Sequence, residues 1–429
     1  MRCPGHANRG DPATPSSRAS FRRRTMRPYS AAPATMPPMA EPLSLYLHIP
    51  FCTAKCGYCD FNSYAGQEHM IPSYTQTLLR EAQLWRKATK DRPIATVFLG
   101  GGTPSLLPLD DVRTLFGGLR AIFDFTPGAE VTLEANPGSL DEGYLRGLLG
   151  AGVHRLSIGV QSLHDDELRA LDRLHSAEDA RAAYAAARSA GYENINLDLI
   201  FGLSEQPIER WQATLEEAIE LRPEHLSLYA LTVEEGTPLA NAVARGRTPA
   251  PDPDNQADQY EWTQQRLAQA GYEQYEISNW SLPGYRCQHN LTYWDCREYL
   301  GLGAGAHSYL NGVRFSTALL PQAYASLVDE SWTNAQGGGD TPMRQVVSGE
   351  TITPELAMSD TLILGLRLLE GVSVERFRER YGMDPFDAFG PQLNESIDLG
   401  LLELRAGYLR LTSRGHFLAN EVFTKLLPD

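Results

Sequence analysis

Short apolar segments alternate with longer amphipathic segments between residues 43 and 231 of the 429-residue chain. The apolar segments predict β-strands at 43–48, 96–99, 130–134, 155–161, 194–200 and 225–231. The amphipathic segments predict helices at 72–89, 108–122, 139–150, 164–171, 176–190 and 206–221. Strands that are apolar along most of their length are typical of a parallel sheet covered on both faces. We therefore expect an α/β fold, a partial (β/α)6 TIM-like barrel that does not close.

The pattern changes after the sixth strand. Residues 247–254 are rich in proline and read as a linker, followed by a helix at about 255–270. Residues 342–429 predict helices at 354–369, 373–381 and 385–400, then a hairpin at 401–411 that turns at Ala406-Gly407, and a last helix. We expect a barrel at 41–240, an extension of it at 241–341, and a small C-terminal winged-helix-like α+β domain at 342–429.

The first 40 residues differ from the rest of the chain. They hold seven arginines, a single acid at Asp11, and many Pro, Ala and Ser residues without a hydrophobic period, so we expect residues 1–40 to be a disordered basic tail. This composition resembles a mitochondrial transit peptide. The favoured alternative is an over-extended gene start, with Met36 or Met39 as the initiator, because frequent Ala, Arg, Gly and Pro suggest a GC-rich bacterial genome.

Charge and cysteine content argue against a nucleic-acid-binding protein and favour a protein of a reducing compartment. The net charge is −15, and it becomes −21 when the tail's seven basic residues and one acid are removed from the totals of 38 and 53. A body this acidic is a poor binder of nucleic acid. Six cysteines in the chain fit a reducing compartment, and no apolar run approaches the ~20 residues of a membrane span. We expect a cytoplasmic protein.

Three of the cysteines lie in one short segment after the first predicted strand. Cys52, Cys56 and Cys59 form the spacing C-x3-C-x2-C. Three thiolates can hold three irons of a 4Fe-4S cluster and leave the fourth iron open to a small molecule. A Cys3His zinc site with His48 and a disulfide are the alternatives, but no second zinc knuckle follows and three is an odd number.

Polar groups follow the other predicted strands. Gly100–Gly102 follow the second strand, Glu134 ends the third, Gln161 ends the fourth, and Asp198 lies near the end of the fifth. Barrel enzymes place their sites at this carboxyl end of the sheet. Each residue alone has an ordinary structural reading, such as a tight turn or a solvated charge, and Arg173 alone would be uninformative.

A second cofactor motif is suspected at 286–294. It places Cys287, His289 and two aromatic residues close together. Imidazole is a common axial ligand of heme iron, whereas a lone histidine is more often a structural hydrogen-bonding group, and Cys287 and Cys296 could be inert buried thiols.

Nine motifs then occur in one order along the chain: YLHIPFC (46–52), CxxxCxYCDFN (52–62), GGGTPS (100–105), EANP (134–137), GVQS (159–162), DLIFGL (198–203), YEISNW (275–280), HNLTYW (289–294) and LGLGAGAHS (300–308). From about residue 43 to its end the chain resembles the HemW-type heme chaperones of the oxygen-independent coproporphyrinogen III oxidase family, which are radical S-adenosylmethionine (SAM) proteins. The resemblance implies a 4Fe-4S cluster on Cys52, Cys56 and Cys59. It implies SAM bound by Tyr46, Gly101, Gly102, Thr103, Glu134, Gln161, Arg173 and Asp198. It also implies heme bound by His289, with Cys287 as the second choice.

The function that the resemblance implies is a heme carrier that passes heme to acceptor hemoproteins, with no catalytic side chain assigned. An electron donor such as flavodoxin or ferredoxin and a homodimer are further expectations. The alternative is the radical decarboxylation of coproporphyrinogen III by an oxidase of the same family. Those oxidases extend the motif to C-x3-C-x2-C-x-C, and Phe61 stands here at the position of the fourth cysteine.

Overall fold

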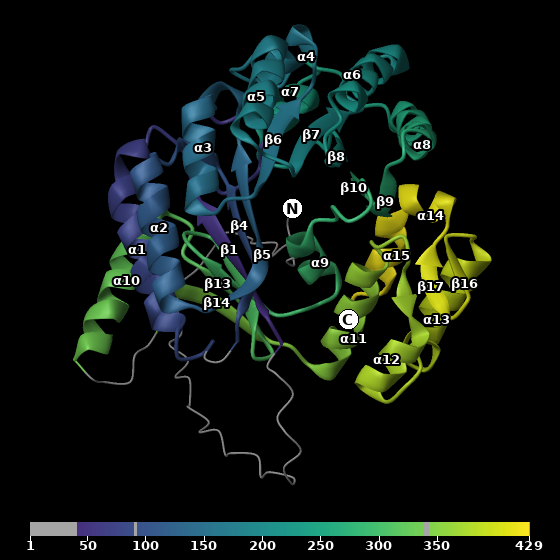
Figure 1. Cartoon of the computed structure of the whole chain (residues 1–429). Helices are drawn as coiled ribbons and strands as arrows, with labels where there is room; N and C mark the ends of the chain where they lie inside the picture. The colour runs from purple at the N-terminus through teal and green to yellow at the C-terminus, as the bar shows by residue number, and fades with distance from the viewer. Residues whose placement is uncertain (1–40, 90–91, 338–342, 429) are drawn as a thin grey trace. The chain divides into compact units, whose positions relative to one another are not determined.

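The computed structural model describes residues 41–89, 92–337 and 343–428 (Figure 1), so the expected basic tail at 1–40 lies outside the described residues. The six predicted strands are present as β1 (Leu43–Ile49), β4 (Ile94–Gly101), β5 (Phe125–Ala135), β6 (Arg155–Gln161), β7 (Ile195–Phe201) and β8 (His225–Ala230). They pair in parallel and in chain order. The α/β partial barrel predicted from the sequence is therefore confirmed.

Helices connect the parallel strands as expected: α1 (Ile71–Trp85), α2 (Leu109–Ile122), α3 (Glu142–Ala151), α4 (Asp165–Ala170), α5 (Ala177–Ala190) and α6 (Ile208–Leu221). The first of them ends four residues earlier than predicted. After Trp85 the Arg86 and Ala88 amides donate to the carbonyl oxygens of Gln83 and Trp85, three residues back, so the chain leaves the α-helix through tighter turns.

The sheet stays open because each edge is continued by other strands. On one side β1 pairs in parallel with β11 (Tyr299–Leu302), which is followed by the antiparallel strands β12 (His307–Leu310), β13 (Val313–Thr317) and β14 (Val346–Thr351). On the other side β8 pairs antiparallel with β10 (Asn279–Ser281), and β9 (Glu273–Glu276) is the last strand. The division of the chain at residues 240 and 341 stays a prediction.

The interior of the partial barrel is polar. Along β1, Leu43, Leu45 and Leu47 are fully buried in the main hydrophobic cluster, whereas Ser44 and His48 are buried on the other face of the strand. Side chains alternate between the two faces of a strand, so the apolar set packs against the helices and the polar set points into the barrel. A polar interior of this kind can hold a polar ligand and still leave the helical shell a continuous apolar core.

The C-terminal part has a hydrophobic cluster of its own. The predicted helices are α11 (Pro354–Gly365), α12 (Val374–Tyr381) and α13 (Pro385–Asp398), followed by α14 (Ser413–Phe417) and α15 (Ala419–Lys425). The predicted hairpin consists of β16 (Leu402–Arg405) and β17 (Tyr408–Leu411), and β15 (Val372–Ser373) adds a third strand. Its turn residues Ala406 and Gly407 have φ of 50° and 81°, as a two-residue hairpin turn with both φ positive requires.

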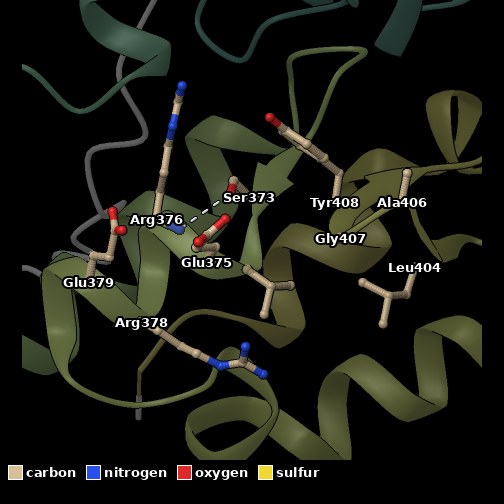
Figure 2. Close-up of a pocket in the computed structure, with 10 residues that line it drawn as sticks. Ser373, Glu375, Arg376, Arg378, Glu379, Leu404, Ala406, Gly407 and Tyr408 are labelled. Atoms are coloured by element: carbon tan, nitrogen blue, oxygen red, sulfur yellow. Dashed lines mark hydrogen bonds between the residues drawn. The ribbon is translucent and has the colours of Figure 1, made fainter.

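A hollow of about 590 Å³ lies in this C-terminal part, between the start of α12 and the hairpin. Figure 2 shows the residues that line it. Its lining mixes the acids Glu375 and Glu379 with the bases Arg376 and Arg378. DNA-binding surfaces neutralise phosphates with an excess of positive charge. The lining of this hollow has no excess of positive charge.

Backbone hydrogen bonds join the C-terminal part to the barrel extension. The Leu369 amide donates to the Tyr275 carbonyl oxygen over 3.1 Å, and the Ile277 amide donates to the Arg367 carbonyl oxygen over 3.1 Å. The Arg367 guanidinium also lies 4.5 Å from the centre of the Trp294 ring. Within the described residues, the helices lack the length and apolar character that crossing a bilayer requires.

Candidate functional site

The cysteine segment is a loop that leaves the carboxyl end of β1 and is closed by a short parallel pair. β2 (Phe51–Cys52) pairs with β3 (Tyr64–Ala65). The Asn62 side-chain amide donates to the carbonyl oxygens of Ala304 and Leu319, each over 3.0 Å. The first bond ties the loop to the LGLGAGAHS segment and the second ties it to the residues after β13. Together with the β2–β3 pair they fix the backbone of the loop.

The three predicted cluster ligands all belong to this loop. Cys52 is buried, Cys56 and Cys59 are half-buried, and none of the three forms a disulfide. Within the described residues, no three His, Cys, Asp or Glu side chains are gathered closely enough to hold a metal ion. Burial raises the pKa of the Cys52 and Cys59 thiols. Ligation by iron would therefore have to release their protons.

His48 does not complete a zinc site with these cysteines. Its Nδ1 makes a 2.9 Å hydrogen bond with the Tyr46 hydroxyl, and its Nε2 makes a 2.8 Å hydrogen bond with the Asn62 carbonyl oxygen. Both ring nitrogens are thus engaged, and burial lowers the pKa of His48 to about 4. His48 is therefore not available as the fourth ligand of a zinc site. Three thiols without a fourth protein ligand fit a 4Fe-4S cluster with one open iron.

The glycine run after β4 lies directly against the cysteine loop. The Gly102 amide donates to the Ile49 carbonyl oxygen and the Thr103 amide to the Phe51 carbonyl oxygen, each over 2.8 Å. A Cβ atom on Gly102 would lie 2.5 Å from the Phe51 carbonyl oxygen. Glycine is therefore required by the close approach of the two backbones.

A chain of side-chain hydrogen bonds links the predicted SAM residues to the cysteines. The Thr103 hydroxyl donates to Cys52 Sγ over 3.5 Å and accepts from the Asn136 amide over 3.2 Å. Arg173 donates to Asn136 Oδ1, to the Gly159 carbonyl oxygen over 3.0 Å, and to Cys56 Sγ over 3.5 Å. Its Nε is buried without a partner. Asn136 was missed in the sequence analysis as a site residue, although the EANP motif contains it.

Two buried carboxylates lie in the barrel interior beside this network. Glu134 Oε2 accepts from the Gly101 amide over 3.2 Å. Burial, and then the neighbouring Asp198, raise the pKa of Glu134 to about 7. Burial also raises the pKa of Asp198, although Asp198 accepts hydrogen bonds of 2.9 Å from both Ser157 and Asn196. The Glu134 carboxylate is therefore only partly ionised near neutral pH.

Gln161 stands at the carboxyl end of β6 with a positive φ of 66°. A Cβ atom on Gly159 would lie 2.9 Å from Gln161 Nε2 and 3.4 Å from Arg173 Nη2, so these two side chains converge over Gly159. A positive φ is uncommon for a residue other than glycine and is found where the surroundings impose it. The structure thus brings Gln161, Arg173, Thr103 and the cysteine loop to the same end of the sheet.

The HNLTYW motif lies at the other end of the barrel. It forms α9 (Gln288–Trp294), whose partners Ser44 and Thr96 lie near the starts of β1 and β4 and whose partner Glu130 lies at the middle of β5. The Ser44 and Thr292 hydroxyls are 2.8 Å apart, and Thr96 Oγ1 is 2.7 Å from His289 Nδ1. Glu130, which pairs with Thr96 in the sheet register, accepts from the His289 amide over 3.0 Å. The predicted heme ligand is therefore not grouped with the predicted SAM residues.

His289 is almost fully buried, with 1% of its surface exposed. Its Nδ1 bonds to Thr96, its Nε2 makes a 2.9 Å hydrogen bond with the Tyr293 hydroxyl, and its ring stacks on Phe98 at a centroid distance of 5.2 Å. Burial, and then the positive charge of Arg155, lower the pKa of His289 to about 3. The imidazole is therefore neutral, which is the protonation state that binds iron.

Cys287 precedes this helix and is fully buried. Its Sγ lies 3.6 Å from Glu130 Oε1, and burial raises the pKa of the thiol to about 12. Glu130 also accepts from the Gln288 amide over 3.0 Å, so its carboxylate caps the start of α9. A protonated thiol held by a carboxylate is a weaker metal ligand than the neutral imidazole of His289.

Comparison with known proteins identifies relatives over the whole described part of the chain. Residues 46–218 match the radical SAM superfamily, and residues 352–418 match the HemN C-terminal domain. The heme chaperone HemW of Bacillus subtilis is 36% identical over 387 residues, which cover 90% of this chain and 99% of that protein. The heme chaperone HemW of Escherichia coli is 37% identical over 395 residues, again 90% of this chain and 99% of the relative.

A solved structure gives the same fold. The coproporphyrinogen III oxidase HemN of Escherichia coli, described as a radical SAM enzyme, superposes with a TM-score of 0.76 over 90% of each chain. Its sequence identity is 23%. This likeness shows the architecture of the partial barrel and its C-terminal domain.

Proposed function

Because the chain belongs to the HemW family of heme chaperones, we propose that it binds heme and transfers it to acceptor hemoproteins. The observation that carries this proposal is the similarity along 99% of the length of its relatives, which includes the segments that hold both candidate sites. The absence of a cysteine at position 61 weighs against the oxidase alternative, because Phe61 lacks the thiol that the oxidase motif carries there.

We assign the cluster to Cys52, Cys56 and Cys59 and the SAM site to the residues around them. Radical SAM proteins carry a 4Fe-4S cluster and SAM, which together supply one-electron reduction of a sulfonium. Thr103 would donate to a ligating sulfur, and Arg173 would bind the SAM carboxylate beside Gln161. Glu134 and Asp198 would accept from the amino group and the ribose hydroxyls. Tyr46, Gly101 and Gly102 complete the proposed SAM site.

We assign heme ligation to His289 Nε2. The hydrogen bond between Nδ1 and Thr96 orients the ring, as second-shell partners of metal-bound histidines do. For Nε2 to bind iron, its hydrogen bond with the Tyr293 hydroxyl would have to break. Since His289 lies on the buried face of α9, this exchange would require the helix to shift. Cys287 remains the second choice.

The partners follow from the same assignments. Respiratory hemoproteins are the proposed acceptors, and reduction of the cluster would need a donor such as flavodoxin or ferredoxin. A homodimer is the proposed assembly.

The test is an anaerobic titration of heme into cluster-loaded protein, followed at the Soret band. The wild type should give a saturable Soret shift, and His289→Ala should lose it. His154→Ala, which removes an exposed histidine, is the control and should bind like the wild type. Full binding by the His289→Ala variant would overturn the ligand assignment, and conversion of coproporphyrinogen III to protoporphyrinogen IX would overturn the chaperone function.

A further inference from the structure

A buried arginine in the barrel interior has no hydrogen-bond or ion-pair partner among the described residues. Arg155 is the first residue of β6 and has 2% of its surface exposed. Among the described residues it makes no side-chain hydrogen bond and no ion pair within 4 Å, and its Nε is a buried donor without an acceptor. An unpaired buried charge is strongly unfavourable, so native proteins almost always pair it.

The carboxylates nearest to Arg155 in the interior are already engaged. Glu130 accepts from the amides at the start of α9 and from Cys287. Asp198 accepts from Ser157 and Asn196, and Glu134 accepts from Gly101. Glu130 and Asp198 stabilise the Arg155 charge only at longer range. The chain itself therefore supplies no direct counterion.

A second unpartnered donor lies beside Arg155. Thr132 is its register partner on β5, is fully buried, and has a hydroxyl without a hydrogen-bond partner. Register partners in a parallel sheet point to the same face and lie about 4.8 Å apart. A guanidinium next to a hydroxyl is a donor pair that matches a carboxylate.

We propose that Arg155 and Thr132 bind a propionate carboxylate of heme while His289 binds its iron. This inference rests on the proposed function. Arg155 is in the layer of the interior that contains His289, because its register partner Thr132 is also the register partner of Phe98, whose ring stacks on His289. The SAM carboxylate is the other anionic group to consider. The SAM residue Gln161 is six residues further along β6, about 20 Å away at ~3.3 Å per residue, so the porphyrin is the closer source.

The experiment compares iron protoporphyrin IX with its dimethyl ester, in which both propionates are esterified, as ligands for cluster-loaded protein in one detergent-containing buffer. The wild type should prefer the free acid. Arg155→Gln should lose about tenfold or more of that preference, the size expected when a charge-assisted hydrogen bond is removed. It should keep the Soret position of the histidine complex, because His289 is unchanged. Arg155→Lys should restore part of the preference.

Thr132→Val provides a second test if Arg155→Gln fails to fold, because it removes only a hydroxyl that lacks a partner. It should reduce the preference by about threefold to tenfold, as loss of one hydrogen bond predicts. Thr214→Val is the matched control: Thr214 on α6 is also buried with an unpartnered hydroxyl, but it belongs to the helical shell. Its preference should equal that of the wild type.

Three results would overturn the inference while leaving the proposed function standing. They are equal binding of acid and ester by the wild type, an undiminished preference in Arg155→Gln or in a folded Thr132→Val, and a loss of SAM binding in Arg155→Gln with the heme preference intact. A wild type that binds neither porphyrin would overturn the proposed function and this inference together.

Discussion

The Tyr293 hydroxyl competes with iron for His289 Nε2 if the proposed ligation is correct. Tyr293→Phe removes this 2.9 Å hydrogen bond while keeping the ring. Because a hydrogen bond contributes about 0.5–1.5 kcal/mol net, heme affinity should rise about threefold to tenfold. A Soret titration measures the change, with Tyr408→Phe on the C-terminal hairpin as a control that should bind like the wild type. Weaker binding by Tyr293→Phe would mean that the hydroxyl contacts the ligand.

Glu134 should make SAM binding depend on pH. Its pKa is raised to about 7, so only about a tenth of the protein carries the ionised carboxylate at pH 6 and most of it does at pH 8. A carboxylate accepts stronger hydrogen bonds than the protonated acid, and SAM affinity should therefore rise about tenfold from pH 6 to pH 8. Equilibrium dialysis with cluster-loaded protein measures it. Glu134→Gln should bind more weakly and with a flat profile, and a flat profile in the wild type would exclude this role.

At the scale of the element, we expect the contact between the glycine run and the cysteine loop to be sensitive to substitution. Gly102→Ala would place a Cβ atom against two backbone carbonyl oxygens, those of Phe51 and Ile49. These backbone atoms cannot move away without shifting the loop. We therefore expect the iron content to fall sharply and the free energy of unfolding to fall by about 1–3 kcal/mol. Iron analysis and urea denaturation check both effects.

The matched control is Gly117→Ala on α2, where a Cβ atom would meet nothing within 4 Å. It should keep its iron and gain about 0.5–1 kcal/mol, since alanine is the better helix former. Normal iron loading by Gly102→Ala would contradict the close-approach argument.

The parallel strands could be predicted from the sequence because burial on both faces produces continuous apolar runs that are visible locally. The grouping of the cysteines, Gly102 and Thr103 could also be predicted, since parallel strands bring their carboxyl ends to one edge. The position of α9 against the parallel strands could not be predicted from the sequence. Its partners Ser44, Thr96 and Glu130 are more than 150 residues away in the chain, and they are ordinary polar residues within apolar segments. Arg155 was not predicted either, because it is a single charged residue at the start of an apolar segment.

For the whole molecule, buried histidines and acids act on stability in opposite directions. The pKa of His48 is lowered to about 4 and that of His289 to about 3, so the unfolded chain binds their protons first. Their contribution to stability is complete above pH 6.5 and is lost as the pH falls toward these values. Glu81 on α1 differs: burial raises its pKa to about 7, so its contribution is complete below pH 4.5 and is lost as the pH rises through 7.

Glu81→Gln should separate the two effects. Glu81 accepts from the Tyr324 hydroxyl over 2.5 Å and from the Gly303 amide over 2.9 Å, and glutamine can keep both bonds. Between pH 4.5 and pH 8 the variant should avoid a loss on the order of 3 kcal/mol that the wild type suffers, while both lose stability below pH 6.5 through the histidines. Urea denaturation across this range measures both profiles. Parallel profiles for the two proteins would refute a raised pKa at Glu81.

Strand β4 touches both candidate sites: Thr96 and Phe98 hold the His289 ring near its start, and the glycine run begins at its end. Thr96 and Gly101 are five residues apart, about 17 Å along an extended strand. If both proposed sites are correct, this separation means that the heme iron and the cluster share no protein ligand. Heme could then bind and leave without changing the ligands of the cluster.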